Sequence, residues 1–502
     1  MTDSTLLPDL IALSAARRPT APALTYGKQS LDYAALAQAV AGFRNGMLAS
    51  GLQRGERVAI YLEKRFETVI ASFGATAAGG VFVPLNPLLK PEQVAYILRD
   101  CNVRVLVTSA ERHALLTETL KTCHDLRHVV IVNADAALPA DGHGPLEYRR
   151  WQDLLQAPEK PGHRVIDTDM AAILYTSGST GKPKGVVLSH RNIVAGGKSV
   201  ASYLDNHTDD TLLAALPLSF DAGFSQLTTA FHAGARVVLL NYLLPRDVIK
   251  ALQNERVTGL TAVPPLYIQL SQLEWPAGID EHLRYFANTG GRMPRETLNA
   301  LRARVPQTRP FLMYGLTEAF RSTYLPPEEV DHRPDSIGKA IPNAEILVLR
   351  EDGTPCAPGE PGELVHRGAL VGMGYWNDPE KTAERYKPLP GREAGLVIPE
   401  VAVFSGDTVR MDEEGFLYFI GRRDEMIKTS GYRISPTEIE EVLYSTQLAG
   451  EVAAFGVDHP TLGQAIIVIA TPKAGEELTA EALLAACRDK LPAYMLPARI
   501  DI

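Results

Sequence analysis

The sequence Tyr175-Thr-Ser-Gly-Ser-Thr-Gly-Lys-Pro-Lys-Gly185 separates two short apolar runs, residues 170–174 and 186–188. Apolar runs bounded by glycine indicate buried strands, so the pattern predicts a strand, a loop and a second strand. Its glycines permit a tight backbone whose N–H groups converge on one point. Together with the hydroxyl and lysine side chains, such a loop suits a polyphosphate. The alternative is a flexible surface linker, which the flanking apolar runs and embedded lysines disfavour.

This loop differs from the Walker A loop of ordinary P-loop ATPases. The Walker A motif has four residues between its glycines and a Ser or Thr directly after the lysine. Here only Ser179 and Thr180 separate the first two glycines, and Pro183 follows Lys182. Proline also removes a backbone donor. We therefore expect a different phosphate chemistry, and steady hydrolysis of ATP to ADP rather than AMP would contradict this expectation.

Composition narrows the class of protein. The chain has 502 residues, 45% of them hydrophobic, which predicts two to four domains with a large core. A formal net charge of −9 disfavours a broad nucleic-acid-binding surface. Its four cysteines are scattered without a CxxC pair, which argues against zinc and for a reducing, cytoplasmic location. We find no signal peptide and no run long enough to span a membrane.

Helix and strand patterns alternate along most of the chain and predict an α/β fold with mainly parallel sheets. Residues 134–165, rich in Pro, Gly and charge, are interpreted as a connecting loop. After residue 352, short strands with Gly and Pro predict a β-rich subdomain over about 353–420. From Asp424 the pattern restarts as a small α+β domain. We therefore expect a large N-terminal domain, 1–423, and a small C-terminal domain, 424–502.

Two further motifs contain groups suited to a nucleotide. In Tyr314-Gly-Leu-Thr-Glu318, a Thr hydroxyl beside a carboxylate suits one phosphate and its Mg²⁺. In Ser405-Gly-Asp-Thr-Val-Arg410, the carboxylate can accept hydrogen bonds from both hydroxyls of a ribose. Taken alone, each motif is also compatible with an ordinary turn. The same holds for Gly290-Gly-Arg-Met-Pro294, which follows a predicted strand.

Asp221 lies in the stretch Leu218-Ser-Phe-Asp-Ala-Gly223 and has two interpretations of equal weight. A buried carboxylate needs a partner, and a substrate ammonium group would be one. Alternatively, Asp221 caps the helix predicted over residues 224–232, because Asp is favoured at helix N-termini.

The 175–185 loop, together with these motifs, resembles the signatures of the adenylate-forming superfamily over nearly the whole chain. That superfamily contains AMP-forming acyl-CoA synthetases, adenylation domains of nonribosomal peptide synthetases, and luciferase. The resemblance implies that ATP and Mg²⁺ activate a small carboxylic acid as an acyl-adenylate. The acyl group then passes to a thiol, either of CoA or of a phosphopantetheine carrier protein acting in trans.

The resemblance also implies roles for individual residues. In the nucleotide site, Tyr314 and Gly291 contact adenine, Thr317 the α-phosphate, Glu318 the Mg²⁺, and Asp407 the ribose with the help of Arg422. The remaining ATP-binding residues are Thr176, Ser177, Gly178, Ser179, Thr180, Gly181, Lys182 and Gly315. The residues expected to be catalytic are Thr176, Lys182, Lys184, Thr317 and Glu318.

By the same resemblance, Asp424 is the hinge about which the small domain turns after adenylation. The region that contacts the acceptor thiol contains Lys428, Gly431 and Arg433. In the substrate pocket, the Phe-Asp pair matches amino-acid adenylation domains, and Arg321 hints at a polar or anionic substrate group. The pocket residues are Phe220, Asp221, Ser225, Ala262, Thr289, Met313 and Arg321.

One feature departs from the family pattern. Family members carry a Pro-x-x-x-x-Gly-Lys motif after a stretch like Leu491–Pro497, and its lysine takes part in adenylation. The sequence stops at Ile502, before any such lysine. Either the sequence is truncated, which we favour, or adenylation is impaired.

These patterns predict an AMP-forming acid–thiol ligase, in the first place an acyl-CoA ligase. The alternative is a stand-alone enzyme that loads an amino acid onto a carrier protein, which the Phe-Asp pair favours. A further alternative is a nucleotide-binding homologue that has lost catalysis.

Overall fold

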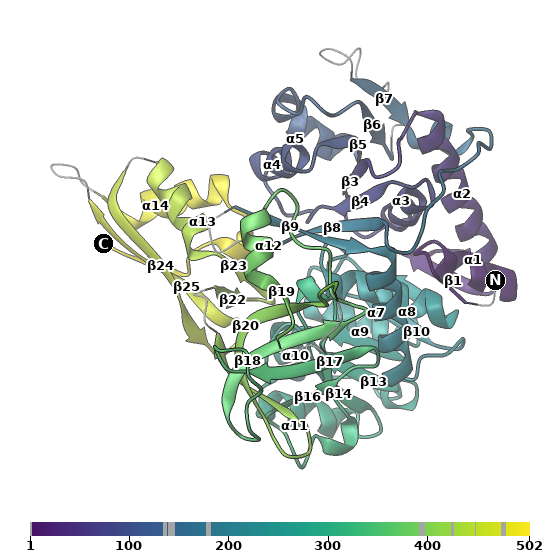
Figure 1. The fold of residues 1–502 in the computed structure, drawn as a ribbon. Helices are drawn as coiled ribbons and strands as arrows, with labels where there is room; N and C mark the ends of the chain where they lie inside the picture. The colour runs from purple at the N-terminus through teal and green to yellow at the C-terminus, as the bar shows by residue number, and fades with distance from the viewer. Residues whose placement is uncertain are drawn as a thin grey trace.

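The computed structural model describes residues 3–133, 138, 146–176, 182–390, 397–422, 426–446, 448–472 and 478–502, without the side chains of Arg422 and Thr437. Within these residues the strands form three sheets, of seven, fourteen and five strands. Figure 1 shows the five-stranded sheet and its helices as a separate body, coloured yellow, beside the two larger sheets. The chain is thus a mixed α/β protein with a large N-terminal part and a small C-terminal one.

The seven-stranded sheet has the order β7-β6-β5-β3-β4-β8-β9. All its neighbouring strands pair in parallel except β8 and β9, which form an antiparallel hairpin around the 175–185 loop. Parallel strands buried on both faces read as continuous apolar runs, as β4 does. The strands are β3 (Arg57–Tyr61), β4 (Val81–Pro84), β5 (Val103–Thr108), β6 (His128–Ile131), β7 (Glu147–Arg150), β8 (Met170–Thr176) and β9 (Lys184–Ser189).

The fourteen-stranded sheet combines a parallel half with an antiparallel half. β1, β11, β10, β12, β13 and β14 pair in parallel, and the hairpin partner β2 lies outside β1. From β15 onward the pairing is antiparallel. The strands are β1 (Pro22–Tyr26), β2 (Gln29–Asp32), β10 (Thr211–Ala214), β11 (Arg236–Leu239), β12 (Gly259–Ala262), β13 (Tyr285–Asn288), β14 (Arg309–Tyr314), β15 (Thr323–Leu325), β16 (Ser336–Ala340), β17 (Ala344–Leu349), β18 (Pro361–Gly368), β19 (Tyr386–Pro388), β20 (Val401–Met411) and β21 (Leu417–Arg422).

Helices cover the two larger sheets and join them. Phe73 of α3 stacks on Phe224 of α8 at 5.7 Å between ring centroids, and Phe82 of β4 lies 4.6 Å from Phe224. These rings are fully buried, so they fix the two sheets relative to each other. The helices are α1 (Asp9–Arg17), α2 (Tyr33–Ala49), α3 (Phe66–Ala77), α4 (Pro91–Asp100), α5 (Ala110–Leu120), α6 (Trp151–Leu155), α7 (His190–Tyr203), α8 (Asp221–Ala233), α9 (Pro245–Asn254), α10 (Pro264–Ser271), α11 (Arg295–Arg304) and α12 (Pro379–Arg385).

The C-terminal body has its own hydrophobic core, which includes Ile439 of α13 and Leu483 of α14. Its sheet has the order β23-β22-β25-β24, and β26 pairs with β25 in parallel. The elements are β22 (Ile427–Thr429), β23 (Tyr432–Ile434), α13 (Pro436–Ser445), β24 (Ala449–His459), β25 (Gly463–Pro472), α14 (Ala480–Lys490) and β26 (Arg499–Asp501).

Two expectations about the elements need correction. Residues 134–165 contain more than a connecting loop, because β7 extends the first sheet and α6 packs Trp151 against Phe43 of α2. In the fourteen-stranded sheet, the continuous series of antiparallel strands begins with the pairing of β14 and β15, before residue 352. Among the described residues, no helix has the length and apolar character needed to cross a bilayer.

Candidate active site

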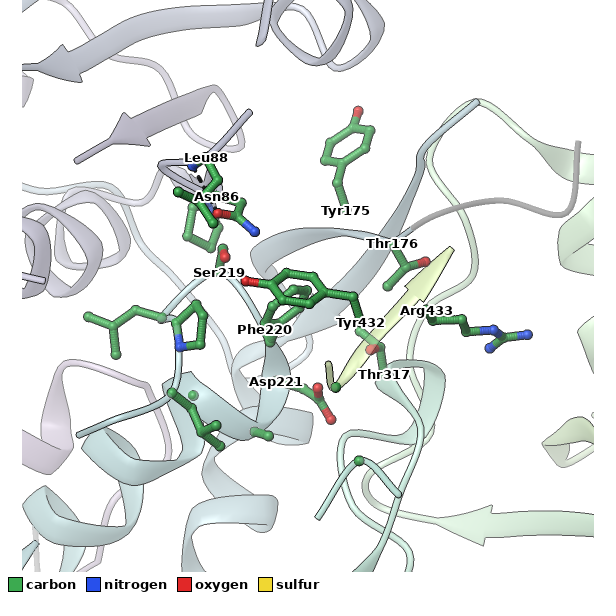
Figure 2. Close-up of a pocket in the computed structure, with 18 of the residues that line it drawn as sticks. Asn86, Leu88, Tyr175, Thr176, Ser219, Phe220, Asp221, Thr317, Tyr432 and Arg433 are labelled. Atoms are coloured by element: carbon green, nitrogen blue, oxygen red, sulfur yellow. Dashed lines mark hydrogen bonds between the residues drawn. The ribbon is translucent and has the colours of Figure 1, made fainter. Parts of the chain in front are cut away.

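A cavity of about 500 Å³ lies where the C-terminal body meets the two larger sheets. Figure 2 shows side chains from both parts of the chain around it, with Tyr432 near Phe220 and Asp221. Its wall is formed by the carboxyl ends of β8 and β14, the start of α8, the segments 84–89 and 215–219, and the loop between β22 and β23. Ligands bind at the carboxyl ends of parallel strands in open α/β sheets, so this location favours a binding site.

Asp407 of β20 and Tyr314 at the end of β14 meet at one side of this cavity. The Tyr314 hydroxyl donates a hydrogen bond to Asp407 Oδ2, although the two residues lie far apart in the sequence. Asp407 lines the cavity, whereas Tyr314 lies behind the adjoining Gly315. Arg422 is paired directly with Asp407 across the β20–β21 ladder. The structure therefore brings together the predicted ribose-binding residues and the aromatic ring expected beside adenine.

Thr317 and Glu318 form a short 3₁₀ turn after β14 and line the same cavity. Glu318 Oε1 accepts a hydrogen bond of 2.7 Å from the Tyr375 hydroxyl, which orients a carboxylate that is 6% exposed. An ionised carboxylate has about four acceptor positions, so Glu318 retains capacity toward the cavity. One carboxylate beside a hydroxyl fits Mg²⁺, which keeps several waters and shares phosphate oxygens.

The lysines of the 175–185 loop differ in environment. Lys182 is exposed, while Lys184 is half-buried with its Nζ 5.8 Å from the centroid of the Tyr375 ring. Burial lowers the pKa of Lys184. Thr176 lines the cavity at the end of β8. Ser177, Gly178, Ser179, Thr180 and Gly181 lie outside the described residues, so their predicted contacts to phosphate stay predictions.

Asp221 and Arg321 form a buried charged pair in the cavity wall. The Arg321 guanidinium is 3% exposed and lies 3.9 Å from Asp221 Oδ2, which is too long for a hydrogen bond. Burial raises the pKa of Asp221, and the positive charge of Arg321 opposes that shift. Arg321 also donates a hydrogen bond of 3.2 Å to Thr289 Oγ1. The pair balances its charges while leaving hydrogen-bonding capacity for a ligand.

The structure tests the capping interpretation of Asp221, while pairing with a substrate ammonium group stays a prediction. Helix α8 begins at Asp221 itself, with Phe220 as its N-cap residue, and no side chain caps the helix. The capping interpretation is therefore wrong, since Asp221 lies within the first turn and its carboxylate lines the cavity. A negative charge in that turn is still favoured by the helix dipole.

The other predicted pocket residues are divided among three places. Phe220 and Thr289 line the main cavity. Ser225 and Met313 line a smaller cavity of about 10 Å³ behind Arg321, which has room for about one water molecule. Ala262 is fully buried in the hydrophobic core and lines neither cavity, because the wall at that level is made by Val263. The wall likewise contains Gly290 in place of the predicted Gly291.

The loop between β22 and β23 inserts into the cavity from the C-terminal body. Lys428, Gly431 and Arg433 all line it, and their contact with an acceptor thiol stays a prediction. Gly431 has φ +82°, and a Cβ built there would lie 2.9 Å from Val263 Cγ1. Such close approach requires glycine. The predicted hinge residue Asp424 lies outside the described residues.

Several wall residues were missed by the sequence reasoning. Tyr432 packs edge-on against Phe220 and stacks on Tyr494 at 3.7 Å between ring centroids. Lys64 donates a hydrogen bond of 2.8 Å to the Ala215 carbonyl, and burial lowers its pKa to about 8. The turn signal at residues 84–87 marked a loop but not its place in the cavity. The other missed residues include Asn86, Gln93, Ser219 and Glu438.

Comparison with known protein families gives two matches. Residues 11–376 match the AMP-binding enzyme family, and residues 438–502 match the C-terminal domain of AMP-binding enzymes. Together they cover both the large and the small part of the fold.

Individual relatives fall into different functional groups. A linear gramicidin synthase of Brevibacillus parabrevis is 30% identical over 488 residues, or 96% of this chain, which spans 9% of that synthase. A long-chain-fatty-acid–CoA ligase of Salmonella typhimurium is 30% identical over 482 residues, covering 90% of this chain and 82% of the ligase. The structure of VinN in complex with L-aspartate is 29% identical with a TM-score of 0.69, covering 83% of this chain and 98% of that one.

Proposed function

The chain belongs to the family of AMP-binding enzymes, the adenylate-forming superfamily, and on this premise we propose that it is an AMP-forming acid–thiol ligase. It activates a carboxylic acid with ATP as an acyl-adenylate and transfers the acyl group to the thiol of CoA or of a carrier protein. The observation that supports this most is the shared cavity. A single cavity is lined by Thr317, Glu318 and Asp407 and by the pair Asp221–Arg321.

In the first half-reaction the substrate carboxylate attacks the α-phosphorus of ATP, and pyrophosphate leaves. Asp407 holds the ribose, while Thr317 orients the α-phosphate. Glu318 would hold the Mg²⁺, which neutralises charge on the phosphates. Lys184, half-buried beside the cavity, adds a fixed positive charge where negative charge accumulates. Positioning and electrostatic stabilisation supply most of the catalysis in such phosphate chemistry.

In the second half-reaction a thiol attacks the acyl carbon, and AMP leaves. The loop between β22 and β23 supports this step, because Gly431 and Tyr432 form part of the cavity wall. Tyr432 packs on Phe220, so the C-terminal body shields the reacting carbon from water on that side. The acceptor is CoA or a phosphopantetheine arm, which share the same thiol.

An amino acid as the substrate is favoured by one specific observation. Asp221 presents a carboxylate to the cavity at the start of α8, and its partner Arg321 is 3.9 Å away. A substrate ammonium would complete the hydrogen bonds of Asp221 at little desolvation cost. The gramicidin synthase relative and the L-aspartate bound to VinN support this candidate. The fatty-acid–CoA ligase supports a plain acid instead.

The test is acid-dependent exchange of pyrophosphate into ATP with matched substrates. Each amino acid is compared with its deaminated analogue, and transfer is then measured with CoA and with a pantetheinylated carrier protein. We expect exchange with at least one acid, and AMP as the nucleotide product. Exchange with amino acids alone would favour a carrier-loading enzyme, and exchange with plain acids an acyl-CoA ligase. ATP binding without exchange for any acid would indicate a non-catalytic homologue.

A further inference from the structure

Glu438 is a buried carboxylate on the acceptor side of the cavity that the reaction described so far does not use. It lies in the first turn of α13 and lines the cavity together with Tyr432 and Tyr494 of the same body. Across from it, the large part of the chain contributes Gln93 at the start of α4, with the segment 86–89. The carboxylate therefore lies in the contact between the two parts of the chain.

Only one of the two carboxylate oxygens of Glu438 has a hydrogen-bond partner among the described residues. Gln93 Nε2 donates to Glu438 Oε1 at 3.3 Å, while Oε2 is buried and has no hydrogen-bond partner in the described part of the chain. The side chain is 9% exposed. A buried acceptor without a donor destabilises the folded protein, and more strongly when it is charged. Such an atom facing a cavity indicates that a ligand or a proton completes it.

Among the described residues, the groups that act on the Glu438 carboxylate do not include a cation. They are the phenols of Tyr96 and Tyr494, the amide of Gln93, and the carboxylate of Glu441 on the same helix. Burial is the main cause that raises the pKa of Glu438 to about 7, and the negative charge of Glu441 adds to it. A group with a pKa near the working pH both accepts and releases a proton efficiently.

Three other ionisable groups of the cavity wall have a partner within the protein, and the proposed function assigns the remaining capacity of Asp221 and Glu318 to the substrate and Mg²⁺. Asp221 faces Arg321, Glu318 accepts from Tyr375, and Lys64 donates to two carbonyls. No histidine or cysteine lies among the described residues of the wall. Glu438 is therefore the wall residue best suited to take a proton on the acceptor side.

We propose that Glu438 is a catalytic residue of the second half-reaction, in which its Oε2 accepts the proton of the incoming acceptor thiol. As the proton moves to Glu438, the sulfur forms a bond to the acyl carbon. The bond between that carbon and the phosphate oxygen breaks, and AMP leaves with the electron pair. Glu438 then returns the proton to solvent when the C-terminal body moves away. This inference rests on the proposed thiol transfer but not on the identity of the acid.

The test separates the two half-reactions in Glu438→Gln, with Glu438→Asp as the conservative variant. Gln keeps the size and the bond from Gln93 but cannot accept a proton. We expect pyrophosphate exchange to remain within about twofold of the parent. Transfer from the preformed acyl-adenylate to pantetheine should fall by about a hundredfold, the usual contribution of general base catalysis. Glu438→Asp should recover part of the loss.

The pH profile and the acidity of the thiol distinguish a base from a structural role. The parent rate of transfer should rise through about pH 7, and the difference between parent and Gln variant should shrink at high pH. With a fluorinated, more acidic thiol as the acceptor, Glu438→Gln should reduce the rate of transfer less than it does with pantetheine, because that thiol is already ionised. Equal losses for both thiols at every pH, or no loss, would overturn the proposal.

Glu481→Gln provides the matched control, since Glu481 is an exposed carboxylate in the first turn of α14 of the same body and does not line the cavity. It should leave transfer unchanged, and a loss as large as that of Glu438→Gln would overturn the assignment. Absence of pyrophosphate exchange in the parent with every acid would count against the proposed function itself. If Glu438→Gln keeps both pyrophosphate exchange and a normal rate of thiol transfer, the result would contradict the role of Glu438 as a base but not the proposed function.

Discussion

Asp221 illustrates how one buried residue sets the polarity of the substrate pocket. Asp221 is the first residue of α8, and its charged neighbour is Arg321. The distance between the two side chains is too long for a hydrogen bond between them. A buried pair of this kind is costly unless further partners complete it. The site is therefore suited to a polar substrate, and poorly suited to a purely apolar chain at this point of the wall.

We expect Asp221→Asn to reduce kcat/KM for amine-bearing acids by about a hundredfold, since it removes the charge that pairs with an ammonium group. Deaminated analogues should change by less than about threefold. Pyrophosphate exchange with the matched substrate pairs measures both. Equal losses for amine-bearing acids and their deaminated analogues would show that Asp221 stabilises the fold rather than binds the substrate. A thermal melt of the variant gives the size of that structural effect.

Tyr314 and Asp407 make a second residue-scale prediction possible. Tyr314→Phe removes the hydroxyl that donates to Asp407 Oδ2 and keeps the ring. Because a hydrogen bond to a charged group contributes about 1.5–3 kcal/mol, the KM for ATP should rise about tenfold or more. The KM for the acid should stay constant, since we propose that the acid binds beside Asp221. A change confined to the KM for the acid would contradict this placement.

At the scale of elements, the turn between β22 and β23 is one of the contacts through which the C-terminal body lines the cavity. Ser430 and Gly431 both have positive φ angles, of 52° and 82°. Gly431 lies against Val263 of the segment that follows β12. The conformation therefore depends on the absence of a Cβ, and the turn cannot be moved outward without opening the cavity.

Gly431→Ala should slow thiol transfer by about tenfold or more while leaving pyrophosphate exchange close to normal. The added Cβ is strained at this φ, which costs about 1 kcal/mol, and it also meets Val263. Gly415→Ala is the matched control, because Gly415 has φ +84° but open space around it. If the control slows transfer equally, backbone strain rather than the contact with Val263 is the cause.

At the scale of the whole molecule, buried neutral groups tie distant segments together. His190 at the start of α7 is fully buried, and its Nδ1 accepts a hydrogen bond of 3.0 Å from the Leu7 backbone N–H. Burial lowers its pKa from 6.5 to about 4. The folded protein therefore keeps this ring neutral at a pH where the unfolded chain protonates it.

This difference predicts that stability falls as the pH decreases from about 6.5 to about 4. In that window the unfolded state binds more protons, so His190 alone accounts for about 2 kcal/mol of lost unfolding free energy between pH 7.5 and pH 5. His190→Asn keeps an acceptor near Leu7 and removes the titration. Urea unfolding at both pH values should show a smaller pH dependence for the variant; an unchanged dependence would assign the effect to other groups.

Local pattern was sufficient for much of the fold. The apolar runs on either side of the 175–185 loop predicted the strands β8 and β9. Helix α2 begins where the Asp32 side chain accepts a hydrogen bond from the Ala35 backbone N–H. Such elements can be predicted from the local sequence, because helix capping and the alternation of buried and exposed residues depend on a few adjacent residues. The small β7 and α6 were missed, since their stability comes from pairing with β6 and packing on α2 rather than from their own sequence.

The sequence by itself determined the family and the α/β class, and it predicted the residues of the nucleotide site, because short motifs with fixed spacing carry that chemistry. The tertiary structure decided which residues line the cavity together. It placed Tyr314 against Asp407, moved Ala262 into the core, and excluded the capping role of Asp221. It also brought Glu438 beside Gln93. These contacts join residues far apart in the chain, and their burial depends on how the sheets and the C-terminal body pack, which no local pattern specifies.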